Sequence, residues 1–294
     1  MWAIHTSRLR RRLAVLVGAA ALTLTGCGGD GGGDESGLPP KNEPLTIGIA
    51  NEQPYGFQKG DKVTGFSPDV ARAVLREMGY TNFKFEVVDF GALVKNLQAE
   101  SFDVVAAGMY LTPDRMKQVA FSDPDYCIGE SLAVKQDNPD NIEDYQSFVD
   151  NSDLTLAVAS GTVEVDYAED AGIPDKQLET YSGIDQMYAA LEAGEVDAVT
   201  GTAATVKSQV KARKGIEAVE SFIPQDSVPP CGGYAFRLED QEFRDAFNEQ
   251  LNKFRKDGTT TEIITKYEDQ DGPSAEEVAK ANEMTTEDFK EAPK

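Results

Sequence analysis

The stretch LQAESFDVVAAG, residues 97–108, decides the fold because a second stretch, LEAGEVDAVTGT at 191–202, repeats its pattern without a gap. At an offset of 94 residues, the matched pairs are Leu97 with Leu191, Ala99 with Ala193, Asp103 with Asp197 and Val105 with Val199. Each copy is typical of a helix end, a tight turn and a buried strand. A repeat this short can also arise from composition, but its position favours two similar α/β lobes in one chain.

Short β-rich runs alternate with helical runs along the chain. The runs expected as strands are 45–50, 83–89, 103–109, 131–136, 154–160, 196–201 and 233–237. In FSPDVARAVLREMGY, Ser67 is the expected N-cap, Pro68 fits the first turn and Gly79 ends the helix. This alternation predicts an α/β fold with largely parallel sheets. We expect two crossover segments, near 131–136 and 226–232, with a ligand cleft between the lobes.

The N-terminus has the features of an export signal. A cluster of arginines between Arg8 and Arg12 precedes an apolar run, 13–24, that is too short to span a bilayer. Leu24 to Cys27 resembles a bacterial lipobox, which implies cleavage of a signal peptide, 1–26, and acylation of Cys27. The alternative is an ordinary signal with a free cysteine. Residues 27–44, rich in Gly, Asp, Ser and Pro, are expected to be a flexible linker.

The composition is strongly acidic. Removal of the four signal arginines leaves 24 basic and 51 acidic residues, a net charge of −27, which argues against a nucleic-acid partner. The only histidine, His5, belongs to the signal, and the remainder shows no metal-ligand cluster and no cofactor motif. Cys127 and Cys231 fall beside the two expected crossings. In an exported protein these two cysteines are candidates for a disulfide, and two buried free thiols are the alternative.

Several motifs resemble one family. NEQPYGF after the first strand, TGFSPDVARAV at the first helix, FDVVAAGMYLTPDRMKQVAFSDPDY and VASGT look like the polar amino acid-binding proteins of ABC importers. The resemblance covers about residues 45–268. It implies a type II periplasmic-binding-protein fold and an exported monomer that delivers a small ligand to a membrane permease. The implied boundaries are 45–133 and 229–268 for lobe 1, 134–228 for lobe 2 and 269–294 for an acidic, peripheral or disordered extension that includes a short helix.

Arg115 is the expected ligand anchor. Thr112 is a good N-cap and Pro113 a good first-turn residue, so Arg115 falls in the first turn of a helix. Its planar guanidinium matches a carboxylate, which is also the role that the resemblance implies. The alternative is a surface arginine paired with a nearby aspartate. Backbone N–H groups near Gly108 and Tyr110, and at the helix that follows Thr162, are expected to assist.

The position where the family carries an aspartate for the ligand's α-ammonium is occupied by Thr202, which cannot neutralise a cation. Lobe 1 offers another arrangement, in which three aromatic side chains, Tyr55, Phe90 and Tyr110, join Glu52 at three strand ends. Such a cage suits a delocalised cation. The whole set resembles the ectoine and hydroxyectoine-binding subgroup, whose ligand is a cyclic amidinium with a carboxylate. Val163 stands where some relatives of that subgroup carry a polar residue.

Three alternatives remain open at this stage. The ligand is a polar amino acid if another carboxylate replaces the missing aspartate. Secreted dehydratases share this lobe architecture, and Glu52 or Glu164 would be the general acid in such an enzyme. A ligand-sensing partner of a membrane receptor is the third. The lipobox and the lack of a catalytic set favour a tethered binding protein without a cofactor.

Overall fold

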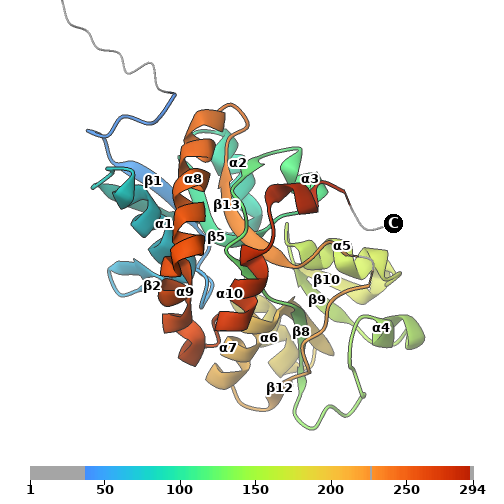
Figure 1. The fold of residues 1–294 in the computed structure, drawn as a ribbon. Helices are drawn as coiled ribbons and strands as arrows, with labels where there is room; N and C mark the ends of the chain where they lie inside the picture. The colour runs from blue at the N-terminus through green and yellow to red at the C-terminus, as the bar shows by residue number, and fades with distance from the viewer. Residues whose placement is uncertain (1–36, 226, 292–294) are drawn as a thin grey trace, which may run out of the picture. The chain divides into compact units, whose positions relative to one another are not determined.

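The computed structural model describes residues 37–225 and 227–291. The expected signal peptide and Cys27 lie outside these residues. Two mixed sheets and a small hairpin form the described part (Figure 1). The first sheet has the order β4 (Phe83–Val87), β1 (Leu45–Ile49), β5 (Val104–Tyr110), β13 (Cys231–Phe236) and β6 (Ala120–Phe121), and β7 (Tyr126–Cys127) also pairs with β13. The second has the order β10 (Leu178–Tyr181), β9 (Leu156–Ala159), β11 (Ala198–Thr202), β8 (Glu130–Lys135) and β12 (Ile216–Ala218).

The helices cover these sheets. The α-helices are α1 (Phe66–Glu77), α2 (Leu93–Gln98), α3 (Pro113–Met116), α4 (Gln146–Asp150), α5 (Val163–Asp170), α6 (Ile184–Ala193), α7 (Ala203–Ala212), α8 (Gln241–Asp257), α9 (Thr259–Ile264) and α10 (Ala275–Asn282). The 3-10 helices are η1 (Phe90–Ala92), η2 (Asp175–Gln177), η3 (Thr265–Gln270) and η4 (Thr286–Phe289), and the hairpin is β2 (Phe57–Lys59) with β3 (Lys62–Thr64). Within the described ranges, no helix combines the length and apolarity needed to cross a bilayer.

The sheets are those of a two-lobed α/β protein, as the sequence predicts. In each lobe the two central βαβ pairings are parallel, β1 with β4 and β5, and β9 with β10 and β11. β8 and β13, the first strands after each crossing, run antiparallel to β11 and β5, and β12, the last strand before the return, runs antiparallel to β8. This is the type II periplasmic-binding-protein arrangement.

The internal repeat has a structural counterpart in a Thr–Asp pair. In lobe 1 the carboxylate of Asp103 accepts from the backbone N–H of Thr46 at 2.7 Å, and the N–H of Asp103 donates to the carbonyl of Thr46 at 2.9 Å. In lobe 2 Asp197 and Thr155 make the same two bonds, at 2.8 and 3.0 Å. The two stretches therefore start equivalent strands in the two lobes, so the repeat reflects shared architecture rather than composition.

The chain changes sheets slightly earlier than expected at the first crossing. β7 still belongs to the first sheet, whereas β8, which begins at Glu130, lies wholly in the second. The crossing therefore falls between Cys127 and Glu130 and not at 131–136. On the return, Phe222 pairs with Glu130 in an isolated bridge, so the two crossing segments touch there. Cys127 and Cys231 are cross-strand partners beside this point and form a disulfide.

The N-cap of the first helix lies two residues before the predicted one. Gly65 is the N-cap of α1 and has a φ of 125°, which favours glycine, so the prediction of Ser67 as N-cap is wrong. Ser67 is instead buried inside the first turn, where its hydroxyl accepts from the N–H of Gly108 at 3.4 Å. Gly79, with a φ of 93°, ends the helix as predicted.

The acidic C-terminal segment is a packed part of lobe 1, and the expectation of a peripheral or disordered extension is wrong for residues 275–289. The expected short helix is α10, which begins with a capping box at Ser274 and lies beside α9 (Figure 1). Val278, Ala281 and Phe289 are fully buried. These few apolar side chains anchor the segment despite its charge.

Candidate ligand-binding site

All nine predicted ligand-binding residues surround one small cavity between the lobes. Its lining consists of Glu52, Tyr55, Phe90, Gly108, Tyr110, Arg115, Thr162, Val163 and Thr202, together with Ala107 and Glu164. The cavity has a volume of about 40 Å³, room for only a few water molecules. A ring-sized solute therefore does not fit this cavity in the described arrangement.

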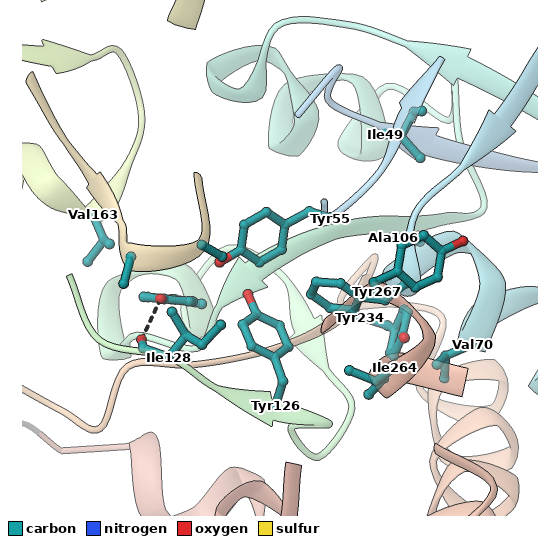
Figure 2. Close-up of a cluster of buried hydrophobic side chains, with 14 of the residues drawn as sticks. Ile49, Tyr55, Val70, Ala106, Tyr126, Ile128, Val163, Tyr234, Ile264 and Tyr267 are labelled. Atoms are coloured by element: carbon teal, nitrogen blue, oxygen red, sulfur yellow. Dashed lines mark hydrogen bonds between the residues drawn. The ribbon is translucent and has the colours of Figure 1, made fainter. Parts of the chain in front are cut away.

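Tyr55 forms the floor of this cavity and requires a glycine beside it. Gly108 has a φ of 65°, and a Cβ there would lie 2.1 Å from the ring of Tyr55. Any larger residue at 108 would push the ring out of place. Figure 2 shows Tyr55 in a buried row of aromatic rings with Tyr126 and Tyr234.

Tyr110 and Tyr126 complete the aromatic wall from the side of the crossing. Tyr110 donates to the carbonyl of Ile128 at 2.7 Å, and Tyr126 donates to the carbonyl of Gly108 at 2.6 Å. The ring centroids of Tyr126 lie 5.5 Å from Tyr55 and 6.1 Å from Tyr110. Tyr126 was not singled out in the sequence analysis. Its ring packs against the rings of both predicted tyrosines. Its signal in the sequence was its place in the SDPDY stretch before the crossing.

Arg115 is held where its sequence context predicts. The side chain of Thr112 accepts from the backbone N–H of Arg115 and caps α3. The guanidinium donates to the carbonyl of Tyr110 at 3.0 Å and lies 5.4 Å from the ring centroid of Phe90. Burial lowers the pKa of Arg115, and Glu164 opposes this effect. The group still keeps its charge and has donors left for a carboxylate.

Glu52 faces the second lobe. Its carboxylate accepts from the hydroxyl of Thr205 on α7 at 2.6 Å. Burial raises the pKa of Glu52 to about 7, an effect that the Thr205 hydrogen bond opposes and Glu164 reinforces. A positive group placed beside Glu52 would favour its ionised form.

The second lobe closes the cavity with Thr202, Thr162 and Val163. Thr202 accepts from the hydroxyl of Tyr55 at 2.8 Å and caps α7 by accepting from the N–H of Thr205. The hydroxyl of Thr162 donates to the carbonyl of Ala159 at 2.9 Å. Val163 is buried in the same apolar cluster as the tyrosines (Figure 2). The Tyr55–Thr202 and Glu52–Thr205 hydrogen bonds therefore join the lobes, and three of these four residues, all except Thr205, line the cavity.

The lobes also meet at two glycines. Arg115 donates to the carbonyl of Gly161 at 3.1 Å. A Cβ on Gly161, which has a φ of 77°, would lie 2.7 Å from the Cα of Gly91 in η1. The two backbones can approach this closely only without side chains, so the described arrangement is a closed one.

Glu164, which lines the site, and Glu130, which is buried near it, were assigned no binding role in the sequence analysis. Glu164 lines the cavity beside Val163 and is nearly buried. Glu130 lies behind it at the start of β8 and is fully buried. The position of Glu164 next to Thr162 was a usable signal, whereas Glu130 stands in an ordinary strand sequence.

A larger cavity of about 780 Å³ adjoins the small one and shares Glu52, Phe90, Thr162 and Glu164 with it. Its acidic lining residues are Glu52, Asp89, Glu164 and Asp185, and none of the described lysines or arginines lines it. The larger cavity therefore attracts cationic groups. Among residues 37–225 and 227–291, no group of three or more His, Cys, Asp or Glu is arranged to hold a metal ion.

A two-lobed α/β fold with an enclosed polar site between the lobes defines a solute-binding protein. The chain matches a family model over residues 45–270, and it belongs to the bacterial extracellular solute-binding proteins, family 3. It is the substrate-binding protein of an amino-acid-type ABC importer, a class located outside the cell membrane.

Individual relatives differ in the ligands their names give. A probable amino-acid ABC transporter periplasmic-binding protein, y4tE of Sinorhizobium fredii, is 30% identical over 83% of this chain and 82% of its own. The arginine-binding extracellular protein ArtP of Bacillus subtilis is 26% identical over 88% of this chain and 98% of its own. A crystal structure of EhuB in complex with hydroxyectoine has a TM-score of 0.76 and 29% identity, and covers 84% of this chain and 94% of that one.

Proposed function

We propose that this protein captures ectoine or hydroxyectoine and delivers it to a membrane permease. The observation that carries the proposal is the set Tyr55, Phe90, Tyr110, Glu52 and Arg115 around one cavity. A cyclic amidinium spreads its charge over a flat ring, which suits aromatic faces, at about 0.5 to 2 kcal/mol per pair. Glu52 would meet the amidinium N–H groups and Arg115 the carboxylate. The hydroxyectoine complex of EhuB supports the same ligand class.

A polar amino acid is the second candidate, and one observation favours it. Glu164 lines the cavity from lobe 2, the lobe in which the family's aspartate is replaced by Thr202. It offers an α-ammonium the carboxylate that Thr202 lacks. The acidic lining of the larger cavity would also suit a basic side chain, in agreement with the arginine-binding name of one relative.

The mechanism we propose is closure of lobe 2 over a ligand bound first to lobe 1. The aromatic rings and Arg115 belong to lobe 1, so a ligand docks there while the lobes are apart. Closure then forms the Tyr55–Thr202 and Glu52–Thr205 hydrogen bonds. The closed form is the one that the permease recognises. Catalysis forms no part of this cycle.

We further propose that the protein is exported and attached to the membrane through an acylated Cys27. The arginine-rich signal and the lipobox support this, and two or more acyl chains give stable attachment. Cells fed a radioactive fatty acid should then label the wild type but not Cys27→Ala, and a wild type without label would contradict the anchor.

Isothermal titration of the protein beginning after Cys27 tests the ligand. Ectoine, hydroxyectoine, glycine betaine and a panel of amino acids including arginine are titrated under the same conditions. Micromolar or tighter binding of the ectoines alone supports the first candidate. Tight binding of an amino acid, with no heat from the ectoines, favours the second and excludes the first.

A further inference from the structure

Glu130 is a buried carboxyl group whose position the fold fixes rigidly. It begins β8 where the two crossing segments pair, with its N–H 2.8 Å from the carbonyl of Phe222 and its carbonyl 2.9 Å from the N–H of Phe222. The side chain is 0% exposed, and no described N–H or O–H donates to either of its oxygens. An unpaired ionised carboxylate in such a place is very costly.

The neighbour within hydrogen-bonding reach of Glu130 is the carboxyl of Glu164 on α5. The other charged groups that face Glu130 are Glu52 from lobe 1 and Arg115 from α3. Glu130 also lies near enough to five tyrosines for its charge to raise their pKa values, namely Tyr55, Tyr110, Tyr126, Tyr145 and Tyr167. Burial, then the nearby Glu164 and Glu52, raise the pKa of Glu130 well above its ordinary value, against a smaller opposing effect of Arg115.

A neutral Glu130 has one O–H to donate, and Glu164 can accept it. That bond leaves the negative charge of the pair on Glu164, which lines both the small and the larger cavity. Glu130 lines neither cavity, so it acts on a ligand only through Glu164. Arg115 and Glu164 attract each other across the lobes. A zwitterion matches both, with its carboxylate at Arg115 and its cation at Glu164.

We propose that Glu130 and Glu164 form a proton-sharing pair in which Glu130 holds the proton and thereby fixes Glu164 as the second lobe's acceptor for the cationic group of the ligand. Glu164 is the ligand-contacting residue and Glu130 the positioning residue. The pair takes over the role that Thr202 cannot fill. This inference rests on the proposed function, since it requires a ligand with both charges.

Infrared spectroscopy tests the proton without any ligand. At pH 9 the carboxyls of Glu52 and Asp125, with pKa values of about 7, are ionised. We expect the protein to keep a protonated carboxylic acid band at this pH, and Glu130→Gln to remove it while Glu169→Gln, at an exposed position on α5, leaves it. A spectrum without the band, or a band that survives in Glu130→Gln, overturns the proposal.

A binding ratio tests the role of the pair. Affinities are measured for ectoine against cyclohexanecarboxylate, and for arginine against 5-guanidinopentanoate, so that each zwitterion is compared with an analogue that lacks the ring cation or the α-ammonium. Glu164→Gln is expected to lower the ratio of the affinity for the zwitterion to the affinity for its analogue about tenfold or more. Glu130→Met, which has no donor, is expected to lower it similarly, whereas Glu130→Gln, which keeps a donor, stays within about threefold of the wild type.

These experiments distinguish failure of the Glu130–Glu164 proposal from failure of the proposed function. A merely structural role for Glu130 would weaken the zwitterion and its analogue equally and leave the ratio unchanged, which overturns the proposal. An unchanged ratio in Glu164→Gln does the same while leaving solute binding intact. Failure of the wild type to bind either zwitterion would refute the proposed ligand classes, and with them the cation-accepting role, whereas the infrared result would still report on the shared proton.

Discussion

The hydroxyl of Tyr55 in lobe 1 donates to the hydroxyl oxygen of Thr202 in lobe 2 at 2.8 Å, so the cavity floor and the lobe closure share one hydrogen bond. From sequence alone, Tyr55→Phe is expected to have little effect on affinity. With this bond in the closed form, we expect Tyr55→Phe to weaken binding by about 0.5–1.5 kcal/mol, roughly two- to tenfold. Titration of Tyr55→Phe, Thr202→Val and the double variant checks the coupling, and additive losses would contradict it.

Arg115 is expected to carry the ligand carboxylate. Arg115→Ala should abolish measurable binding, because a buried carboxylate would lose its only cationic partner among the residues that line the small cavity. Arg115→Lys keeps the charge but loses the planar pair of donors, so an intermediate loss of about tenfold or more is expected. Isothermal titration measures both. Full affinity in Arg115→Ala would show that the carboxylate binds elsewhere.

Ligand affinity should depend on pH through Glu52. Its pKa of about 7 in the closed form without ligand means that a cationic ligand held there must displace a proton below pH 7. Affinity is therefore expected to be level above pH 7 and to fall by up to tenfold per pH unit below it. Glu52→Gln should bind weakly and remove this part of the profile. Titrations between pH 5 and 8 would refute the assignment if affinity rose as the pH fell.

Closure is expected to require the two facing glycines. Gly161→Ala adds a methyl group against Gly91 and places a side chain at a φ of 77°, so it should disfavour the closed form. Small-angle scattering with saturating ligand should then report a larger radius of gyration than for the wild type. Gly172→Ala is a matched control, because its φ of 89° is similarly strained but nothing lies within 4 Å of its Cβ.

The Cys127–Cys231 bond is expected to contribute substantially to stability. It closes a loop with a sequence separation of 104, for which chain entropy gives about 4 to 5 kcal/mol. Urea unfolding of the variant with both cysteines changed to alanine should show a loss up to this size. The wild type under a strong reductant is the control and should match it. An unchanged urea midpoint would mean that the disulfide does not stabilise the folded protein, and would contradict this prediction.

The sequence predicted the strands, the two lobes and the Thr112–Arg115 motif because each is encoded by neighbouring residues. The residues that line the small cavity were predicted together because parallel strand ends meet at one edge. Glu130 was missed because its partner comes from a helix in the next part of the chain, and nothing in ESLAVK marks it. The C-terminal segment was misjudged because its anchors, Val278, Ala281 and Phe289, are few among many charges.

The strand order also constrains the order in which the two lobes can fold during synthesis and export. All five strands of the second sheet come from the continuous stretch 130–218, so this lobe can assemble as soon as that stretch emerges. The first sheet lacks one of its inner strands until β13 joins β5 to β6 and β7. The lobe to which we propose the ligand docks first is thus the last to receive all its strands, and Cys231 reaches Cys127 only at that late stage.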